Sequence, residues 1–530
     1  MAAAPQQRQT GLLGLIERAG NRLPDPVFIF FWLIAILILG SVVAAALNYA
    51  AEHPTQIDEA TGAPAVIEAT SLLSAENIRR LWVEMPATFT HFHPLGYVLV
   101  VMLGAGIAER SGFFAAAMRA GVRGAPKALL TPAVAFVGMM GNLAADAAYV
   151  VLIPLAGVLY AAAGRHPIAG IAAAFAGVSG GFSANLLPGQ LDALLFGITE
   201  TAVEQIVPAW DANIAGNWWF IAAMLIVFLP VIWIVTDVII EPRLKRFSAP
   251  DGEAMQTLGD ADAPLSDAEK KGLGRAGLAM LAVAALWAFF TLGPGTPLID
   301  EEAANPEARL TPFYQSLVAG FLVLFLVSGW VYGAAVGTVK NHRDAVKMMA
   351  GAMGDLSYYL VLAFAAAHFV AMFNWSNLGL IFAVQGAGAI ESSGLPMPAL
   401  LALIVLFTSG INLLVGSASA KWALLAPVLV PMMMLLGVSP EMTTAAYRVG
   451  DGATNIITPL MVYFPLVLTF CQRWRTDFGL GSLTATMIPY SIWILIVGIA
   501  LTLAWVYLGV PPGPGAEVQY TLPPAAAPAP

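Results

Sequence analysis

The chain has 530 residues, of which 59% are hydrophobic and only 11% are charged, and its formal net charge is −9. Soluble globular chains carry roughly 25% charged residues, so this composition excludes an ordinary soluble domain and indicates a polytopic membrane protein. No basic cluster suggests a nucleic-acid partner. A single cysteine, Cys471, excludes an internal disulfide framework and a cysteine-based metal site.

Apolar runs of about 20 residues predict membrane spans. The chain holds nine, at residues 27–47, 95–108, 168–187, 218–240, 277–292, 316–336, 356–373, 442–470 and 487–508. Two further apolar stretches, 128–163 and 400–436, are broken by small and polar residues in the way that re-entrant hairpins are. The predicted fold class is an all-α membrane protein with nine spans plus two re-entrant hairpins.

The loop charges predict which side of the membrane each loop faces. Lysine and arginine concentrate in short cytoplasmic loops, and here they gather in the N-terminal segment and at 109–127, 165, 243–246, 340–347 and 473–475. The loops at 52–84, 200–211 and 300–307 are acidic. One topology satisfies both sets: N-terminus inside, C-terminus outside, and the two hairpins entering from opposite sides.

This topology divides the chain into two inverted repeats. We expect a cytoplasmic N-terminus at 1–26, a first repeat at 27–240 and a cytoplasmic connector at 241–274. A linker span with an acidic outer loop follows at 275–311, and the second, inverted repeat covers 312–510. The Pro- and Ala-rich tail, 511–530, is predicted to be disordered.

The two repeats carry matching polar breaks. Asn142 and Asn185 are 43 residues apart (185 − 142), and so are Asn412 and Asn455 (455 − 412). In each pair the first asparagine interrupts a hairpin, and the second lies in a Gly-containing break shortly before a proline. Such breaks at matching places in two halves indicate a transporter binding site, so we predict that these four asparagines contribute to cation binding.

The stretch 410–459 concentrates polar groups at membrane depth, where they are costly and mark substrate or ion paths. Asp451 lies one helical turn before Asn455, and a hard cation prefers carboxylate, amide and backbone oxygens. Arg448 matches a substrate carboxylate in a bidentate way, but an Arg448–Asp451 ion pair at i and i+3 is a competing interpretation. Trp422 offers a stacking surface for an aromatic ring, or it packs in the core.

Four stretches resemble the p-aminobenzoyl-glutamate transporter (AbgT) family. They are RHPIAGIAAAFAGVSGGFSANLLPGQLDALL (165–195), FNWSNLG (373–379), INLLVGSASAKWALLAPVLVPM (411–432) and AAYRVGDGATNIITPLMVYF (445–464). The resemblance extends over nearly the whole chain. It implies a homodimeric secondary transporter of the bacterial inner membrane, without enzymatic activity and without a cofactor other than its coupling ion.

The resemblance also implies roles for individual residues. It assigns Asn412 and Asp451 to a sodium site. It puts seven residues along the substrate path: Asp192, Ser419, Trp422, Pro440, Arg448, Asp451 and Pro459. The substrates that it implies are small aromatic anions, namely p-aminobenzoyl-glutamate and p-aminobenzoate-type folate metabolites, together with sulfonamides, moved by import or by efflux.

No P-loop pattern occurs, so a gradient of sodium or protons, and not ATP, is the expected energy source. Three alternatives stay open at this point. The first is a sodium-coupled dicarboxylate transporter of similar hairpin architecture, and the second is a channel. The third is a membrane-embedded enzyme, whose only chemistry would come from His91 and His93.

Overall fold

The computed structural model describes residues 25–57, 61, 63–123, 125–144, 147–208, 210, 212–244, 264–292, 295–301, 308–458 and 460–522. Regular structure in these ranges is almost all helical, which confirms the all-α fold class. The one sheet among them pairs β1 (Ala50–Ile57) with β2 (Pro64–Glu68), antiparallel, in the acidic segment after the first span. This small sheet was not predicted.

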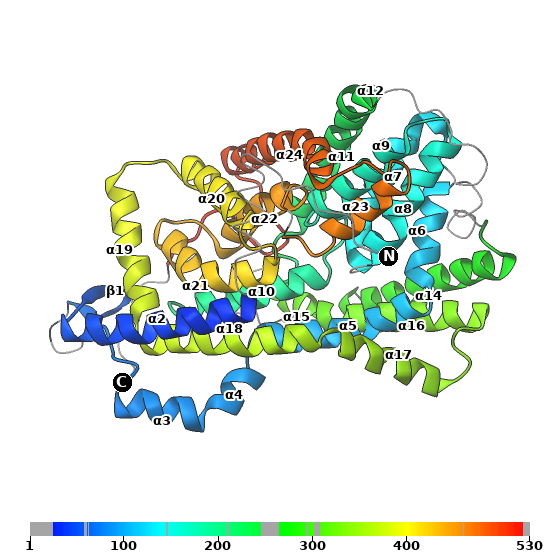
Figure 1. The fold of residues 1–530 in the computed structure, drawn as a ribbon. Coiled ribbons are helices and arrows are strands. Elements are labelled where there is room, and N and C mark those ends of the chain that lie inside the picture. The colour runs from blue at the N-terminus through cyan, green and yellow to red at the C-terminus, as the bar shows by residue number, and fades with distance from the viewer. Residues whose placement is uncertain are drawn as a thin grey trace, which may run out of the picture.

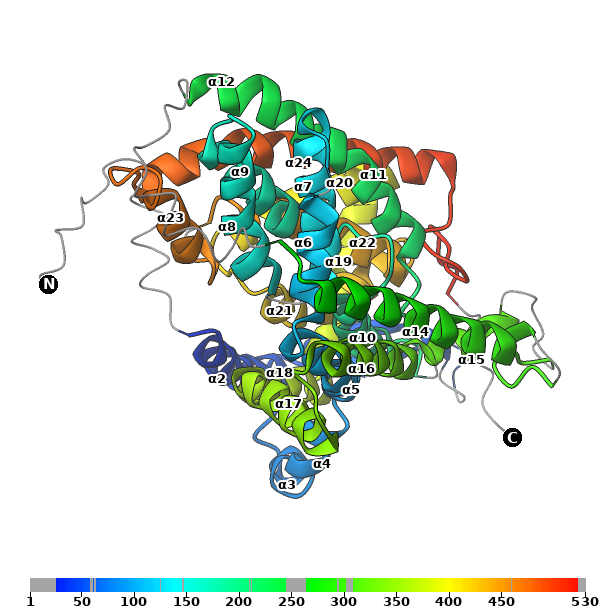
Figure 2. The same cartoon turned by 90° about the vertical axis from the view of Figure 1, so that its right-hand side faces the viewer.

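One group of helices forms the lower band in Figure 2, and we call it the scaffold. It consists of α2 (Pro26–Ala46), α5 (His93–Arg110), α14 (Asp267–Leu292), α16 (Leu317–Val336), α17 (His342–Asp355) and α18 (Ser357–Trp375). A Cβ built on Gly104 of α5 would lie 2.4 Å from the backbone oxygen of Leu322 in α16. Small residues of this kind let helices pack closely where lipid gives no hydrophobic driving force.

The second group, which we call the core, contains two helical hairpins. The first joins α7 (Leu130–Met140) to α8 (Ala147–Ala162) through the short turn η2 (Gly141–Ala144). The second joins α20 (Met397–Asn412) to α21 (Ala418–Leu435). In Figure 1 the arms of the first hairpin lie to the right of α22 (Pro440–Asn455) and those of the second to its left. The hairpins therefore approach the centre from opposite directions.

Two helices of the core are broken where the sequence places glycine and asparagine. The first runs as α9 (Pro167–Phe175) into a π-helical turn, η3 (Ala176–Gly180), and resumes after a gap as α10 (Gln190–Val203). The second is α22, which is followed after a gap by α23 (Phe464–Gln472). Two long helices complete the core: α11 (Trp218–Ile234), which continues through η4 (Val235–Ile240) into α12 (Glu241–Arg243), and α24 (Leu480–Leu508).

Seven helices of the described residues are long and apolar enough to cross a membrane. The number is eight if the pair Pro94–Arg110 and Phe113–Val122, bent by 65°, counts as one span. The two predicted spans at 168–187 and 442–470 are the broken helices, so neither half of them reaches that length. One of the seven, Ala418–Leu435, is an arm of the second hairpin. The chain is therefore a multi-pass membrane protein in which hairpins and broken helices accompany the continuous spans.

Shorter helices connect these parts. They are α3 (Ala75–Val83), α4 (Met85–Thr90), α6 (Phe113–Arg123), α15 (Thr311–Gln315) and α19 (Leu378–Ser392), with the 3-10 turns η1 (Lys127–Leu129) and η5 (Ala308–Leu310). Figure 1 shows α19 crossing the direction of α18, at the end of the molecule where β1 also lies. The sidedness of these ends stays a prediction from the loop charges.

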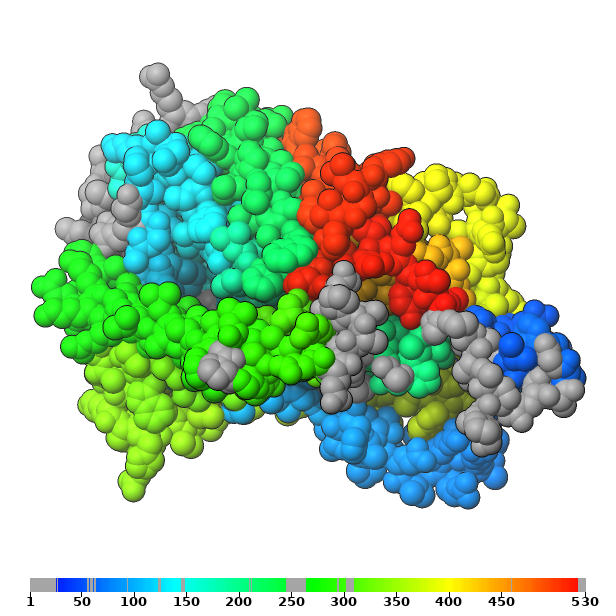
Figure 3. Space-filling model, turned by 180° about the vertical axis from the view of Figure 1, so that it is seen from behind, coloured from blue at the N-terminus to red at the C-terminus, as the bar shows by residue number. Residues whose placement is uncertain are grey.

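The prediction that the tail is disordered is wrong for residues 511–522. The backbone N–H of Ser439 donates to the Val518 oxygen at 3.1 Å, and that of Tyr520 donates to the Gly437 oxygen at 2.9 Å. The N–H of Phe220 donates to the Pro512 oxygen at 2.9 Å. Figure 3 shows the red C-terminal part of the chain packed on the surface of the molecule. Backbone hydrogen bonds to the start of α22 and of α11 hold this segment in place despite a Pro-rich composition that favours disorder. Residues 523–530 lie outside the described ranges.

Candidate polar sites at the hairpin tips

The tips of the hairpins and the breaks in the helices bring two polar clusters into the core. Every residue of α22 is buried, and this helix carries side chains of both clusters. Its close fit depends on glycine, because a Cβ on Gly450 would lie 2.4 Å from the Val405 oxygen of α20. A Cβ on Gly452 would lie 2.8 Å from the Gly180 oxygen of η3.

The first cluster lies where the second hairpin meets α22. The Nδ2 amide of Asn412 donates to the Asp451 backbone oxygen at 2.7 Å, and to Thr454 Oγ1 and Asn455 Oδ1 at 2.9 Å each. Asn455 Nδ2 in turn reaches Asp451 Oδ2 at 3.5 Å. The hairpin asparagine and the break asparagine of the second repeat are therefore in direct contact, while their role in cation binding stays a prediction.

The same cluster contains Lys421, which the sequence analysis did not assign to a site. Its ammonium donates to Asn412 Oδ1 and forms an ion pair with Asp451 Oδ1, and the Lys421 side chain is fully buried. A sequence signal was available, because a carboxylate buried at membrane depth needs a compensating positive charge. Lys421 lies nine residues after Asn412 in the hairpin.

These contacts decide how well a sodium ion fits between Asn412 and Asp451. Sodium binds to oxygen lone pairs, and the Oδ1 atoms of both residues accept hydrogen bonds from Lys421 instead. Because the Lys421 ammonium already neutralises the Asp451 carboxylate, a second positive charge would be unbalanced in this buried place. The arrangement does not fit the sodium ion that the family resemblance implied.

The second cluster joins the two repeats through an ion pair. Arg448 Nη2 donates to Asp192 Oδ1 at 2.7 Å, and both side chains are more than nine-tenths buried. Asp192 Oδ2 accepts from the backbone N–H of Gly189 at 2.7 Å, which also fixes the start of α10. The Arg448–Asp451 pair considered from the sequence does not form, because Asp192 and Lys421 are the partners of these two residues.

A small cavity of about 20 Å³ lies beside this pair. It is lined by Asn142, Leu143, Phe182, Ser183, Asn185, Leu187, Gly189, Gln190, Leu191, Asp192 and Arg448. Three buried atoms of its lining have no hydrogen-bond partner among the described residues: Arg448 Nε, Ser183 Oγ and Asn142 Oδ1. Unpartnered buried polar groups are rare, so this wall is equipped to bind a small polar group.

Asn142 and Asn185 hold the tip of the first hairpin against the first break. Asn142 Nδ2 donates to the Met139 oxygen at 3.1 Å and to the Gly181 oxygen at 3.3 Å. Asn185 Nδ2 donates to the same Met139 oxygen at 3.3 Å. The two asparagines of the first repeat therefore meet at one carbonyl and line one cavity, while their role in cation binding stays a prediction.

Trp422 packs inside the core in this structure. Its ring stacks on Tyr447 with centroids 4.4 Å apart, and its Nε1 donates to Thr199 Oγ1 at 2.9 Å. The Trp422 side chain is fully buried. Ser419, one turn earlier on α21, is half-buried and lines a separate small cavity. Contact of Trp422 with a substrate ring therefore needs a rearrangement of the core.

Of the two prolines in the predicted substrate path, the structure describes Pro440 but not Pro459. Pro440 is buried at the first position of α22, where its missing N–H costs no hydrogen bond, and its carbonyl accepts from Thr444 Oγ1 at 2.8 Å. It positions the helix and does not line the cavity beside Arg448. Pro459 lies outside the described residues.

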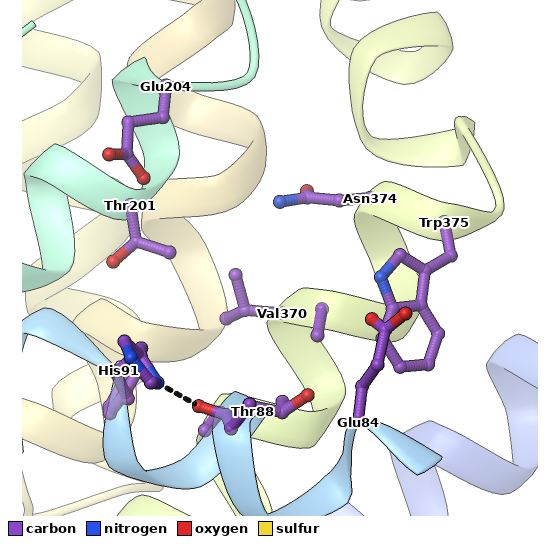
Figure 4. A pocket seen from close by; sticks show the side chains of 12 residues that line it. Glu84, Thr88, His91, Thr201, Glu204, Val370, Asn374 and Trp375 are labelled. Atoms are coloured by element: carbon purple, nitrogen blue, oxygen red, sulfur yellow. Dashed lines mark hydrogen bonds between the residues drawn. The ribbon is translucent and has the colours of Figure 1, made fainter. Parts of the chain in front are cut away.

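A larger cavity, of about 350 Å³, lies between α4, α10 and α18. Figure 4 shows Thr201 and Glu204 on one wall, Asn374 and Trp375 on another, and Glu84 near the base. Two carboxylates in this lining do not suit an anionic ligand. His91 also lines it, but the side chain of His93 lies outside the described set. No group of three or more potential metal-ligating side chains occurs among the described residues.

Comparison with known proteins gives a consistent result over nearly the whole chain. Residues 11–520 match the AbgT putative transporter family. The chain is 35% identical over 517 residues to the p-aminobenzoyl-glutamate transport protein of Escherichia coli K12, which covers 97% of this chain and 98% of that one.

Two solved structures share the fold. The YdaH transporter of Alcanivorax borkumensis has a TM-score of 0.84 and 42% identity, covering 93% of this chain and all of its own. MtrF of Neisseria gonorrhoeae, described as illuminating a class of antimetabolite efflux pumps, has a TM-score of 0.87 and 40% identity, covering 96% and 100%. The protein is therefore a membrane transporter, not an enzyme, and it belongs to the AbgT family.

Proposed function

We propose that the protein is an ion-gradient-coupled secondary transporter of p-aminobenzoyl-glutamate and p-aminobenzoate-type folate metabolites, with sulfonamides as further substrates. One observation carries the proposal. Arg448 is buried between the two repeats, is paired with Asp192, and keeps its Nε–H unpartnered beside a small polar cavity. A guanidinium with a spare donor suits a carboxylate, and both p-aminobenzoyl-glutamate and p-aminobenzoate carry one.

The relatives support the same class of substrate. The Escherichia coli relative is named for p-aminobenzoyl-glutamate transport, and MtrF is described in connection with antimetabolite efflux. Sulfonamides are structural analogues of p-aminobenzoate, so one binding site accommodates both kinds of ring.

The size of the cavity supports transport by alternating access. About 20 Å³ holds roughly one water molecule, whereas pockets for small organic ligands measure roughly 300–1,000 Å³. A substrate therefore reaches Arg448 only when the hairpin tip and the helix breaks that line this cavity move apart, and in the proposed cycle this accompanies a movement of the core against the scaffold. In that open state Asp192, Ser419, Trp422, Arg448 and Asp451 contact the substrate, with Pro440 and Pro459 shaping the path.

The remaining parts of the proposal concern the ion, the assembly and the membrane. A gradient of protons or of sodium drives transport, with Asn142, Asn185, Asn412, Asp451 and Asn455 as the residues expected to respond to the ion. Two copies form a homodimer in the bacterial inner membrane, with the N-terminus in the cytoplasm. The mass of the detergent-solubilised protein, measured by light scattering, tests the dimer.

The test of the function is uptake of labelled p-aminobenzoyl-glutamate and p-aminobenzoate into proteoliposomes. A sodium gradient alone and a pH gradient alone are compared, with Arg448→Met as the inactive control. We expect saturable accumulation under one gradient and its loss in Arg448→Met. Competition by unlabelled p-aminobenzoate but not by small dicarboxylates supports the aromatic substrate. Accumulation under neither gradient, or a preference for small dicarboxylates, overturns the proposal.

A further inference from the structure

Lys421 has the position and charge of a monovalent cation bound at the second hairpin. Its ammonium contacts Asn412 Oδ1 and Asp451 Oδ1, the two side chains expected to bind sodium. These contacts join three helices, since Asn412 ends α20, Lys421 lies in the first turn of α21, and Asp451 lies in α22. An ammonium and a sodium ion carry the same charge, and both interact favourably with oxygen atoms.

The orientation of the Asn412 amide is fixed by its surroundings. Its Nδ2 faces three oxygen acceptors, on Asp451, Thr454 and Asn455. A flipped amide would turn its oxygen toward these acceptors, so Oδ1 must point to Lys421. The oxygen that would bind a cation is therefore directed at the ammonium by the whole cluster.

The charges of this cluster are balanced without an ion from solution. The Lys421 and Asp451 side chains are at most 2% exposed, so one positive and one negative charge are enclosed together. Among the described residues, Asp451 is the only carboxylate that forms an ion pair with Lys421. A sodium ion entering beside this pair would leave a net positive charge in a buried site, where unpaired charge is strongly disfavoured.

We propose that the Lys421 ammonium is the resident cation of the Asn412–Asp451 site, so that this transporter binds no sodium ion there. This proposal adds to the proposed function the identity of the cation at one site, and its consequence for transport rests on that function. Of the two gradients considered, that of sodium is excluded at this site and that of protons remains. Removal of the ammonium creates a sodium site, because Asp451 then needs another cation.

The test is equilibrium binding of radioactive sodium to the purified, detergent-solubilised chain. Wild type is expected to bind no saturable sodium, whereas Lys421→Gln gains one saturable site. Adding Asn412→Ala to Lys421→Gln should weaken that binding by about tenfold or more, as loss of an oxygen ligand does. Lys421→Arg keeps a positive charge and should bind no sodium, which controls for a change of side chain as such.

A second measurement applies if the Lys421→Gln protein is too unstable to purify. Lys421→Ala is then prepared in the presence of methylammonium, a small cation that can replace the missing ammonium group. The thermal midpoint of unfolding of this variant is compared in methylammonium, sodium and choline chlorides. We expect the first two salts to raise the midpoint and choline not to. The proposal is overturned if wild type binds sodium saturably and Asp451→Asn abolishes that binding. It is also overturned if neither methylammonium nor sodium raises the thermal midpoint of the Lys421 variant. Failure of substrate uptake would contradict the proposed function without changing these binding results.

Discussion

At the scale of single residues, a substitution of Arg448 tests whether this side chain binds substrate or only completes the ion pair with Asp192. Arg448→Lys keeps a positive charge for Asp192 but loses the unpartnered Nε–H and the planar fork. We expect the KM for p-aminobenzoyl-glutamate to rise about tenfold, which corresponds to the loss of one charge-assisted hydrogen bond of about 1.5 kcal/mol. Uptake into proteoliposomes over a range of substrate concentrations measures this. An unchanged KM would limit Arg448 to a structural role.

The comparison variant Arg448→Met leaves the Asp192 carboxylate buried without its partner. Removing one partner of a buried pair costs about 3–5 kcal/mol, so the thermal midpoint of this variant should fall clearly below that of Arg448→Lys. Replacing both residues, as Asp192→Asn with Arg448→Gln, should recover much of the stability and none of the transport.

The packing of Trp422 leads to a prediction about the stability of variants that lose its hydrogen bond to Thr199. Trp422→Phe keeps the stacking on Tyr447 but loses the hydrogen bond to Thr199. Thr199→Val loses the same bond together with the hydroxyl's contacts to Leu195 and Thr444. Each change should cost at least about 1 kcal/mol in unfolding free energy, the contribution of the shared hydrogen bond. The double variant should cost less than the sum, because both changes remove one interaction. Strictly additive losses in thermal unfolding would mean that the bond contributes nothing.

The internal symmetry of the sequence singled out polar residues of the hairpins and breaks, but local spacing did not identify the charge pairs. The equal spacing of the asparagines singled out Asn412 and Asn455 as residues of one site, and in the structure they hydrogen-bond at 2.9 Å. It did not identify Asp192 as the partner of Arg448, because these residues are 256 positions apart and meet only when the two broken helices pack. Local spacing suggested Asp451 instead, since i,i+3 and i,i+4 neighbours are the pairs that a single helix brings together.

At the scale of elements, one polar cluster fixes the first hairpin to the end of the long helix formed by α11, η4 and α12. Arg165 binds Asp237 and Glu241 at 2.5 Å each and donates to Thr131 Oγ1 at 2.9 Å. Its side chain is 18% exposed, so the cluster is partly desolvated. The four residues come from α7, the turn after α8, η4 and α12.

Arg165→Gln should therefore destabilise the fold by about 2 kcal/mol, since it leaves two half-buried carboxylates close together without their cation. A matched control exists in Arg475, which pairs with Asp477 at 2.8 Å but is 55% exposed. Arg475→Gln should cost less than about 1 kcal/mol, as exposed pairs do. Thermal unfolding in one detergent compares the two variants, and equal losses would contradict a special role for the Arg165 cluster.

Elements built from apolar periodicity and breaks were predictable, and those built from long-range backbone pairing were not. Glycine, asparagine and proline mark the hairpin tips and helix breaks directly in the sequence. The segment 511–522 has a composition typical of disorder, but its backbone bonds to Gly437, Ser439 and Phe220. Those partners cannot be inferred from the composition of the segment, and β1 (AAEHPTQI) and β2 (PAVIE) show no regular alternation of apolar and polar residues that would predict strands.

At the scale of the whole molecule, the proposed alternating access implies that the core moves against the scaffold at their interface during transport. Tyr97 of the scaffold donates to Glu200 Oε2 of α10 at 3.2 Å across this interface. Arg110 and Asp355 pair at 2.5 Å within the scaffold, between α5 and α17. These two pairs allow movement between the bodies to be separated from movement within one of them.

Cysteine pairs test this movement, and the single native cysteine, Cys471, is buried and is first replaced by serine. Cross-linking Tyr97→Cys to Glu200→Cys with a short thiol reagent should abolish uptake into proteoliposomes, because it joins α10 to the scaffold. Cross-linking Arg110→Cys to Asp355→Cys should leave most uptake intact, because both residues belong to the scaffold. Equal inhibition by both cross-links, or by neither, would contradict a cycle in which the core moves against the scaffold. Selective inhibition by the first would locate the moving boundary between α5 and α10, the helix that carries Asp192 and part of the lining of the cavity of about 20 Å³.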